Sequence, residues 1–218
     1  WFSAVEGEVY AMSTFFTCLT LWTAVKWYTL PDTAQNDRWI VLTVYAGGLS
    51  IGVHLLSLLT FPALALFYYF KKYKNHNLLG MGIAAAIGVV AFVAIQKLVI
   101  IGIPTLWKYM ELMMVNGIGL PFHTGLIPTL LIIGAIFFFG LRYADKVGNH
   151  LLQITLVSAM LVVISFSTIG VVVIRANANT PINMNAPSDP MRLLPYLNRE
   201  QYGERPLLYG PNYNAQPT

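Results

Sequence analysis

The sequence has little charge and almost no cysteine. Only 10% of its 218 residues are charged and 56% are hydrophobic, whereas a soluble domain carries about 25% charged residues. This shortage excludes an ordinary soluble domain and predicts an all-α polytopic membrane protein. The single cysteine, Cys18, cannot form a disulfide within the chain and is expected to pack as a small apolar residue. The net charge of +4 does not indicate a nucleic-acid partner, because the basic residues lie in short clusters between apolar runs.

Several chemical motifs are also absent. The four histidines lack the i,i+4 pairing and the cysteine partners that zinc sites use, so no metal site is expected. There is no glycine-rich nucleotide loop and no nucleophile elbow, so neither a nucleotide site nor a serine-hydrolase site is expected. The chain also has no initiator methionine and no signal-peptide pattern, and we expect it to be an internal fragment of a longer protein.

Apolar runs separated by short polar loops predict about six transmembrane crossings. Single crossings are expected over residues 9–30, 78–103, 124–141 and 151–174, and the run 39–70 supplies the other two. The positive-inside rule then places the basic loops in the cytoplasm and both ends of this chain outside. The basic residues of these loops are Lys26, Arg38, Lys71, Lys72, Lys74, Arg142 and Lys146.

The run 39–70 is expected to form a short helical hairpin. As one helix, its 32 residues would be about 48 Å long, against a hydrocarbon core of about 30 Å. Its middle, residues 47–54, is rich in glycine and ends at His54. We therefore predict two short helices that meet near His54 and stop short of the outer surface.

Two further segments are expected on the outer side. Residues 104–123 mix aromatic, charged and methionine side chains, which is typical of an interfacial helix lying on the membrane surface. Beyond residue 175, asparagines and prolines indicate a linker, residues 188–190 predict a helix start, and Gly203 is a plausible stop. We therefore divide the chain into a transmembrane domain, 1–175, and an extracytoplasmic linker with the start of a soluble domain, 176–218.

Two carboxylates stand immediately before the first apolar run. Acidic side chains at the edge of hydrocarbon are costly unless they face water, a partner or a substrate. Gly7 separates Glu6 from Glu8 and disfavours a continuous helix, and an extended backbone would point both carboxylates to one side. This acidic turn is expected to line a cavity at the outer face. The alternative is that Glu8 lies in the first turn of a helix, where the macrodipole favours a negative charge.

Other polar residues are expected on the same outer side. His54 at the tip of the hairpin could hold a phosphate or a sugar hydroxyl, because broken helices with polar tips line water-filled cavities. Its alternative role is a structural bond to a carbonyl of a neighbouring helix. Arg175 could bind a lipid phosphate or simply anchor its helix at the interface. Residues 196–203, including Arg199 and Glu200, are rich in groups that bond sugars or peptides, although a solvated helix would look similar.

Four stretches of the chain resemble one bacterial membrane family. Residues 3–12 resemble its acidic turn, and residues 48–56, followed by Pro62 and Ala63, resemble its short hairpin. Its outer signature is similar to residues 175–181 and 196–203. The family is glycosyltransferase family 117, formerly a domain of unknown function, which lies within the C-type glycosyltransferase superfamily and has a eukaryotic transmembrane protein O-mannosyltransferase as a relative.

The resemblance implies a multi-pass enzyme of the bacterial inner membrane. Such an enzyme transfers a sugar, with mannose as the first expectation, from a polyprenyl-phosphate-linked donor to Ser or Thr hydroxyls of exported proteins at the outer face. The implied partners are membrane lipid, this donor and the exported acceptor protein, with no further cofactor and no nucleic acid. The resemblance implies catalytic roles for Glu6 and Glu8, and substrate-binding roles for Tyr10, His54, Arg175, Arg199 and Glu200.

One departure from the family pattern concerns the catalytic base. In the family the acidic loop thought to supply the base lies upstream of the stretch that matches residues 3–12. Glu6 and Glu8 match the second acidic motif, so the resemblance also allows them to position the sugar or the acceptor.

Two other classes of function remain open from the sequence. A polytopic transporter or lipid flippase would also use a broken helix around a polar cavity, but transporters commonly carry a second interrupted segment in an inverted repeat. No counterpart to residues 39–70 stands out elsewhere in the chain. A non-catalytic membrane assembly subunit predicts instead that Glu8 and His54 have no open cavity between them.

Overall fold

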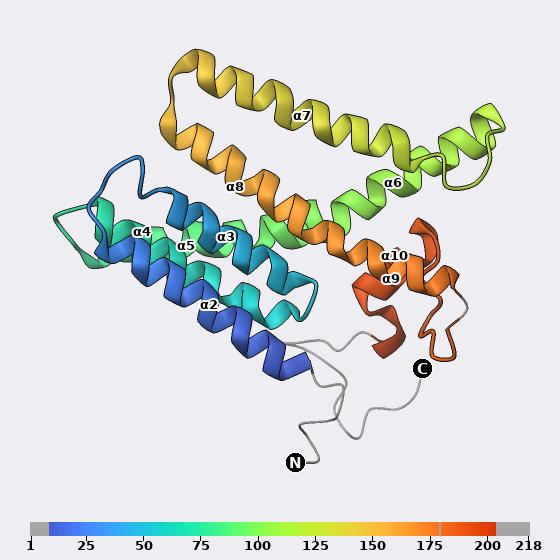
Figure 1. The fold of residues 1–218 in the computed structure, drawn as a ribbon, viewed down its shortest axis with the longest axis horizontal. Helices are drawn as coiled ribbons and strands as arrows, with labels where there is room; N and C mark the ends of the chain where they lie inside the picture. Colours follow the sequence, from blue (N-terminus) through green and yellow to red (C-terminus); the bar gives the residue numbers. More distant parts are fainter. Residues whose placement is uncertain (1–8, 179, 204–218) are drawn as a thin grey trace, which may run out of the picture.

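The computed structural model describes residues 9–178 and 180–203, which form helices joined by loops (Figure 1). No strand occurs among these residues, and the predicted all-α class is confirmed. Of the short elements, η1, η4 and η5 are 3₁₀ turns, and η2 and η3 are π-helical. In chain order the elements are α2 (Val9–Thr29), α3 (Arg38–Ile51), η1 (Leu55–Thr60), α4 (Phe61–Lys72), α5 (Leu78–Ala94), η2 (Ile95–Ile101), α6 (Gly102–Leu112), η3 (Met113–Gly117), α7 (Leu126–Val147), α8 (His150–Phe166), η4 (Ser167–Ile169), α9 (Gly170–Asn177), α10 (Pro190–Asn198) and η5 (Glu200–Tyr202).

The predicted short hairpin is present and consists of α3, η1 and α4. Helix α3 has 14 residues and α4 has 12. Each is therefore about 20 Å long and shorter than a hydrocarbon core of about 30 Å. The helix breaks after Ile51, and the amide of His54 bonds back to the carbonyl of Ser50 at 2.8 Å. The glycine-rich middle of the run thus becomes the tip of the hairpin, as expected.

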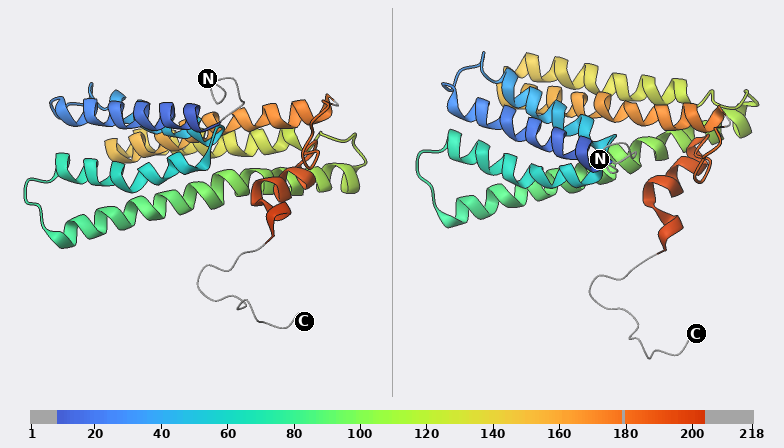
Figure 2. Two further views of the ribbon diagram at one scale, coloured as in Figure 1. Left: turned by 90° about the horizontal axis from the view of Figure 1, so that it is seen from below. Right: turned by 60° about the horizontal axis from the view of Figure 1, so that its bottom comes forward.

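The segment after the hairpin differs from the prediction. We expected a crossing over 78–103 followed by a separate surface helix over 104–123, but one helical segment of 40 residues continues from Leu78 to Gly117 (Figure 2). Pro104 does not break it, because the wider π turn of η2 directly before Pro104 relieves the clash between a proline ring and the preceding turn. The segment is about 60 Å long, twice the thickness of a hydrocarbon core.

Three of the described helical segments are long and apolar enough to cross a membrane. They are Leu78–Gly117, Leu126–Val147 and His150–Asn177, and they indicate a membrane protein. The other expected crossings are less apolar or shorter: α2 has 21 residues but includes several threonines, and the two arms of the hairpin are short. The last two long segments form an antiparallel pair that turns at Gly148, whose φ of 67° lies in the left-handed region that glycine readily adopts.

Short polar side chains join α2, α3 and α8. The hydroxyl of Thr43 donates to that of Thr23 at 3.0 Å, which links α3 to α2. On the other side of α3, Ser165 Oγ of α8 donates to the Tyr45 carbonyl at 3.3 Å. A Cβ on Gly48 would lie only 2.9 Å from Ser165 Oγ, so the glycine allows the two helices to approach closely. This three-helix interface is the tightly packed side of the bundle.

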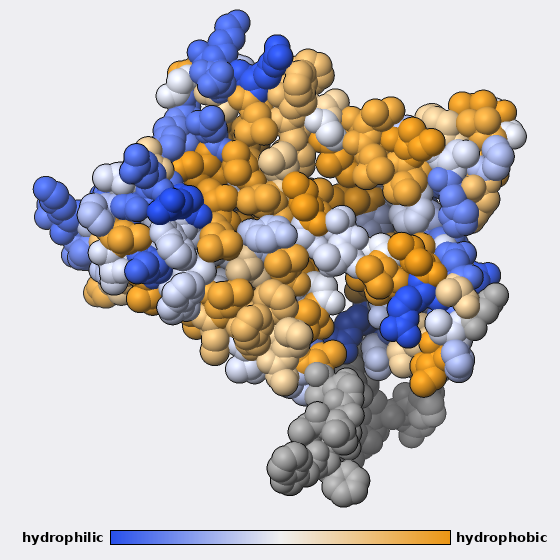
Figure 3. Space-filling model, viewed as in Figure 1, coloured by the Kyte–Doolittle hydropathy of each residue, from blue (hydrophilic) through white to orange (hydrophobic). Residues whose placement is uncertain are grey.

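The helix ends and loops at one end of the bundle carry seven of the basic residues, and we call this end the basic end. Hydrophilic side chains gather there in Figure 3, on the left of the view. The buried Asp37 carboxylate accepts from Trp27 Nε1 at 3.2 Å and lies 2.9 Å from His150 Nε2, which ties α2, α3 and α8 together. Lys71 Nζ lies 4.2 Å from the centre of the Trp27 ring. The loops of the basic end are residues 30–37, 73–77 and 148–149.

The polar tail returns to the bundle. Helix α10 begins where the sequence predicted, because the Asp189 carboxylate caps it by accepting from Met191 N at 2.9 Å and Arg192 N at 3.0 Å. Leu193 is buried, and α10 packs against α6 and η2. Gly203 directly follows η5. The assignment of residues 176–218 to the start of a soluble domain stays a prediction.

Candidate functional site

The tip of the hairpin and the start of α2 bring two of the predicted site residues together. The tip, residues 52–57, is called the His54 turn, and it lies at the end of α3 and α4 away from the basic end, while α6, α7 and α9 extend beyond it (Figure 1). The His54 side chain is partly buried, and its ring centre lies 5.7 Å from that of Tyr10, with the planes inclined by 43°. Tyr10 is 62% exposed. An aromatic ring and an imidazole therefore stand side by side at one surface.

Two buried serines hold the His54 turn against α2. The hydroxyls of Ser13 and Ser57 are 3.5 Å apart. Ser57 Oγ also donates to the carbonyl of His54 at 3.0 Å. Because Ser13 follows Tyr10 by three residues, the two lie on the same face of α2. This face of α2 therefore positions both the ring of Tyr10 and the backbone of the turn.

The other side of the turn rests against the end of α8. A Cβ on Gly52 would lie 2.5 Å from Thr168 Oγ1 of η4, so a glycine is required where these two segments approach each other. Beneath the turn lies a cluster of buried apolar side chains from α3, η1, α4, η2 and α8, which forms the floor of the turn. The buried members of the floor are Ile51, Leu58, Phe61, Ile100, Val162 and Phe166.

The two predicted catalytic carboxylates are not part of this geometry. Glu6 and Glu8 lie outside the described residues, so their predicted place beside the turn stays a prediction. In the sequence they precede Tyr10 by four and two residues. The described part of the site consists of the phenol of Tyr10, the imidazole of His54 and the hydroxyls around them.

The other predicted substrate-binding residues lie on the last helices. Arg175 is exposed in the last turn of α9. Arg199 follows α10 with its guanidinium 5.0 Å from the centre of the Tyr202 ring, and Glu200 accepts from Asn198 Nδ2 at 3.1 Å. Among the described residues, no hydrogen bond or ring contact joins Arg175, Arg199 or Glu200 directly to His54.

One connection does link the tail to the floor of the His54 turn. Leu197 of α10 packs against the cluster that contains Leu58 and Ile100. Arg199 and Glu200 therefore follow a residue that rests on the same apolar floor. The tail helix and the His54 turn share a support, although their polar groups stay apart.

Sequence reasoning missed three residues that fix the geometry of the turn: Ser13, Ser57 and Thr168. A signal for Ser13 was available, because it is one helical turn from Tyr10 and therefore shares its face. Ser57 and Thr168 gave no such signal, since their roles depend on contacts between distant segments. Across residues 9–178 and 180–203, no group of three or more His, Cys, Asp or Glu side chains is arranged to hold a metal ion.

The described groups can perform recognition and charge stabilisation. The Tyr10 ring offers a face for stacking and a hydroxyl for hydrogen bonding. The His54 imidazole can donate a hydrogen bond to an anionic oxygen, and when protonated it also supplies a positive charge. Together these groups suit a ligand that carries both hydroxyls and a phosphate.

Comparisons with known proteins relate the first third of the chain to a family. Residues 1–77 match the family model described as the Protein O-mannosyl-transferase TMEM260 N-terminal domain. No curated protein and no solved structure gave a match. The match supports an O-mannosyltransferase-like family and does not point to the bacterial family 117 in particular. It covers 77 of the 218 residues, and Tyr10, the short hairpin and His54 all lie within this O-mannosyltransferase-like region.

Proposed function

We propose that this chain is part of an integral-membrane glycosyltransferase. The enzyme moves a sugar, with mannose as the first candidate, from a polyprenyl-phosphate-linked donor to Ser or Thr hydroxyls of exported proteins. The observation that carries this proposal is that the family match covers both segments that build the site, α2 and the His54 turn. The apolar helices agree with a donor that resides in a membrane.

The proposed reaction is an inverting displacement at the sugar. The acceptor hydroxyl oxygen bonds to the anomeric carbon, the bond from that carbon to the phosphate oxygen breaks, and the polyprenyl phosphate leaves with the bonding electron pair. The hydroxyl proton passes to a carboxylate base. The resemblance places that base in an acidic loop upstream of residues 3–12, and we assign Glu6 and Glu8 to positioning the acceptor or the sugar.

His54 and Tyr10 act on two neighbouring groups of the donor in this scheme, the phosphate and the sugar. Negative charge develops on the departing phosphate, and a hydrogen bond or positive charge from the His54 imidazole stabilises it. The Tyr10 ring, 5.7 Å away from that imidazole, stacks on the sugar. Arg175 supplies a second cation for the phosphate, and Arg199 with Glu200 contacts the acceptor polypeptide.

The charge distribution supports one orientation in the membrane. The basic end faces the cytoplasm under the positive-inside rule. The His54 turn lies at the end of α3 and α4 away from the basic end and therefore opens toward the outer side. We accordingly propose the bacterial inner membrane as the location, with both ends of this chain extracytoplasmic.

The direct test measures sugar transfer by the full-length protein to an acceptor peptide. The variants are Glu8→Gln and His54→Ala, with His76→Ala as the matched control because His76 is an exposed histidine of the basic end. We expect turnover to fall about 10²-fold in His54→Ala, as when one transition-state donor is removed, to fall in Glu8→Gln because the acceptor or sugar is positioned less well, and to stay unchanged in the control.

Two outcomes would refute the proposal. Unchanged turnover in both Glu8→Gln and His54→Ala would remove the site assignment. Uptake of a lipid-linked sugar into proteoliposomes without any covalent product would show a transporter or flippase instead.

A further inference from the structure

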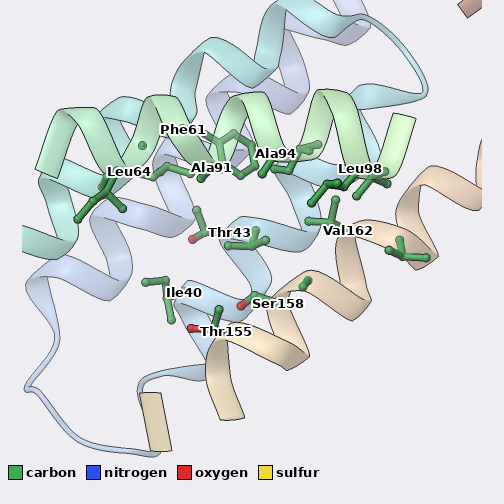
Figure 4. Close-up of a pocket in the computed structure, with 18 of the residues that line it drawn as sticks. Ile40, Thr43, Phe61, Leu64, Ala91, Ala94, Leu98, Thr155, Ser158 and Val162 are labelled. Atoms are coloured by element: carbon green, nitrogen blue, oxygen red, sulfur yellow. The ribbon is translucent and has the colours of Figure 1, made fainter. Parts of the chain in front are cut away.

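A second feature lies away from the His54 turn, on the loosely packed side of the bundle. Helix α7 packs on α8 and α6, and Figures 1 and 2 show that it separates from α5 toward the basic end. Between these helices is a cavity of about 700 Å³, which we call the α5–α7 groove. Figure 4 shows Ala91 and Leu98 on one side of it, Thr43 on its floor and Ser158 on the other side.

The lining of the groove favours an apolar ligand. Most of its side chains are aliphatic or aromatic. Two hydroxyls in it already have partners. Thr155 Oγ1 donates to the Leu151 carbonyl of its own helix at 2.8 Å, and Thr43 Oγ1 shares its proton between the Trp39 carbonyl at 2.8 Å and Thr23 Oγ1 of α2 at 3.0 Å. A hydrocarbon chain can therefore fill the space without leaving these groups unpaired.

The size of the groove favours a single chain over a helix. A helix about 10 Å across that spans a core of about 30 Å occupies roughly 2,400 Å³. The cavity of the groove is about 700 Å³, the size of a pocket for a small molecule rather than for a helix. An acyl chain of a membrane lipid is the slender apolar object that such a space admits.

One end of the groove has the chemistry of a headgroup region. Trp27 and Tyr68 line it there and stack with ring centres 5.8 Å apart, and such aromatics commonly mark the membrane interface. Lys72 follows Tyr68 by one helical turn, and its Nζ lies 2.5 Å from Asp32 Oδ1. The described residues at the basic end carry seven positive side chains against three negative ones. They are Lys26, Arg38, Lys71, Lys72, Lys74, Arg142 and Lys146 against Asp32, Asp37 and Asp145.

The other end of the groove is closed. Phe61 and Val162 line the groove and also belong to the cluster beneath the His54 turn. Leu58 and Ile100 of that cluster are almost completely buried. The floor of the turn therefore separates the groove from the polar site, and a lipid whose phosphate lies at His54 would not enter the groove from that side.

We propose that the α5–α7 groove binds an acyl chain of an anionic phospholipid, from the leaflet at the basic end, with Lys72 at the phosphate. Asp32 competes with the phosphate for Lys72. The site differs in place and chemistry from the His54 turn, and the inference does not depend on sugar transfer.

The test is native mass spectrometry of the full-length protein with phosphatidylglycerol and phosphatidylcholine that carry identical acyl chains. We expect phosphatidylglycerol to be retained about fivefold more, the size of one lysine's attraction to an anionic surface. Lys72→Gln should abolish this preference, and Asp32→Asn should increase it. Lys97→Gln is the control and should change nothing, because Lys97 is an exposed lysine of the segment Leu78–Gly117, outside the basic end.

Substitutions that place a large side chain in the groove test whether the acyl chain binds there. Ala91→Phe from α5 and, independently, Ala159→Phe from α8 should each abolish retention of phosphatidylglycerol. Val90→Phe is the control, because Val90 neighbours Ala91 but is 67% exposed. Two variants on different helices are used so that a folding defect in one is not mistaken for loss of binding. Melting temperatures are recorded for all three variants.

Three results would overturn the proposal. They are equal retention of the two phospholipids, unchanged retention in both groove-filled variants, and displacement of phosphatidylglycerol by a polyprenyl phosphate. His54→Ala should leave phospholipid retention unchanged, so loss of sugar transfer in that variant tests the enzyme proposal separately.

Discussion

The α2–α3–α8 interface and the α5–α7 groove lie in the same bundle and use apolar helices in opposite ways. In the interface, Gly48 and small hydroxyl side chains bring the helices into close contact, and bonds such as that from Thr43 to Thr23 cross between them. In the groove, the hydroxyl of Thr155 bonds only to its own helix, and about 700 Å³ remains between the helices. Helices in a membrane therefore pack closely where they carry small and polar residues. Apolar side chains alone do not draw helices together there, because lipid tails cover apolar surface equally well.

The close-packed side and the open side of the bundle support different sites. The close-packed side supports the His54 turn, because Ser57 and Ser13 pin that turn to α2 while α8 and η4 support it from the other side. The open side presents a groove to the bilayer. The His54 turn, which needs fixed geometry, lies on the close-packed side, and the groove, which can accept a flexible chain, lies on the open side.

The largest loss of stability is expected at the junction between α6 and α7. Glu111 of α6 is 0% exposed and accepts hydrogen bonds from the amide of His123 and, at 2.9 Å, from that of Gly125 at the start of α7. Glu111→Ala removes two charge-assisted bonds and should lower the free energy of unfolding by about 3–5 kcal/mol. Unfolding in a denaturing detergent titration measures this change.

Controls for that variant separate the loss of the two hydrogen bonds to Glu111 from a general loss of charge. Glu111→Gln keeps one acceptor oxygen and should cost less than Glu111→Ala. Glu200→Ala removes an exposed carboxylate and should cost little. If Glu111→Ala is no more harmful than Glu200→Ala, then α6 and α7 are not held by this carboxylate, and another contact must limit the width of the open side.

A smaller loss is expected where α3 meets α8. In Gly48→Val the new side chain would collide with Ser165, whose Oγ lies 2.9 Å from the position of a Cβ on residue 48. Overpacking of this kind costs about 1–3 kcal/mol. Gly134→Val on α7 is the matched control, because nothing lies within 4 Å of its Cβ position. Equal melting temperatures for the two variants would remove the distinction between the close-packed and the open side.

The sequence predicted the parts of this fold that depend on local signals. The hairpin followed from the length of the run 39–70 and the glycines before His54, and the start of α10 followed from the capping residue Asp189 before a proline. The continuation of the helix through Pro104 was not predicted, because the effect of that proline depends on the π turn before it. Local patterns do not reveal such a compensation.

The candidate site was predictable only in part. His54 was found because an ionisable residue at a helix break is unusual, and the structure places Tyr10 beside it. The contact of Ser13 with Ser57 and the approach of Gly52 to Thr168 depend on how distant helices are placed, which sequence spacing does not specify. The α5–α7 groove was missed for the same reason, since it results from the divergence of two helices that each look like ordinary apolar spans.

The smallest expected effect is also the sharpest comparison of the two sides. Thr43→Val removes the bond to Thr23 Oγ1, whose length is 3.0 Å, and hydrogen bonds between transmembrane helices are worth about 0.6 kcal/mol. Thr155→Val makes the same chemical change in the groove, where the hydroxyl bonds only to the Leu151 carbonyl, and its cost should be close to zero. Both are measured by the same unfolding titration. The substitution is identical, but Thr43 is buried and Thr155 is exposed, so the difference reports the bond between helices together with the difference in burial. Equal costs would mean that polar contacts do not distinguish the two sides, and close packing around Gly48 alone would then have to explain the rigid support of the His54 turn.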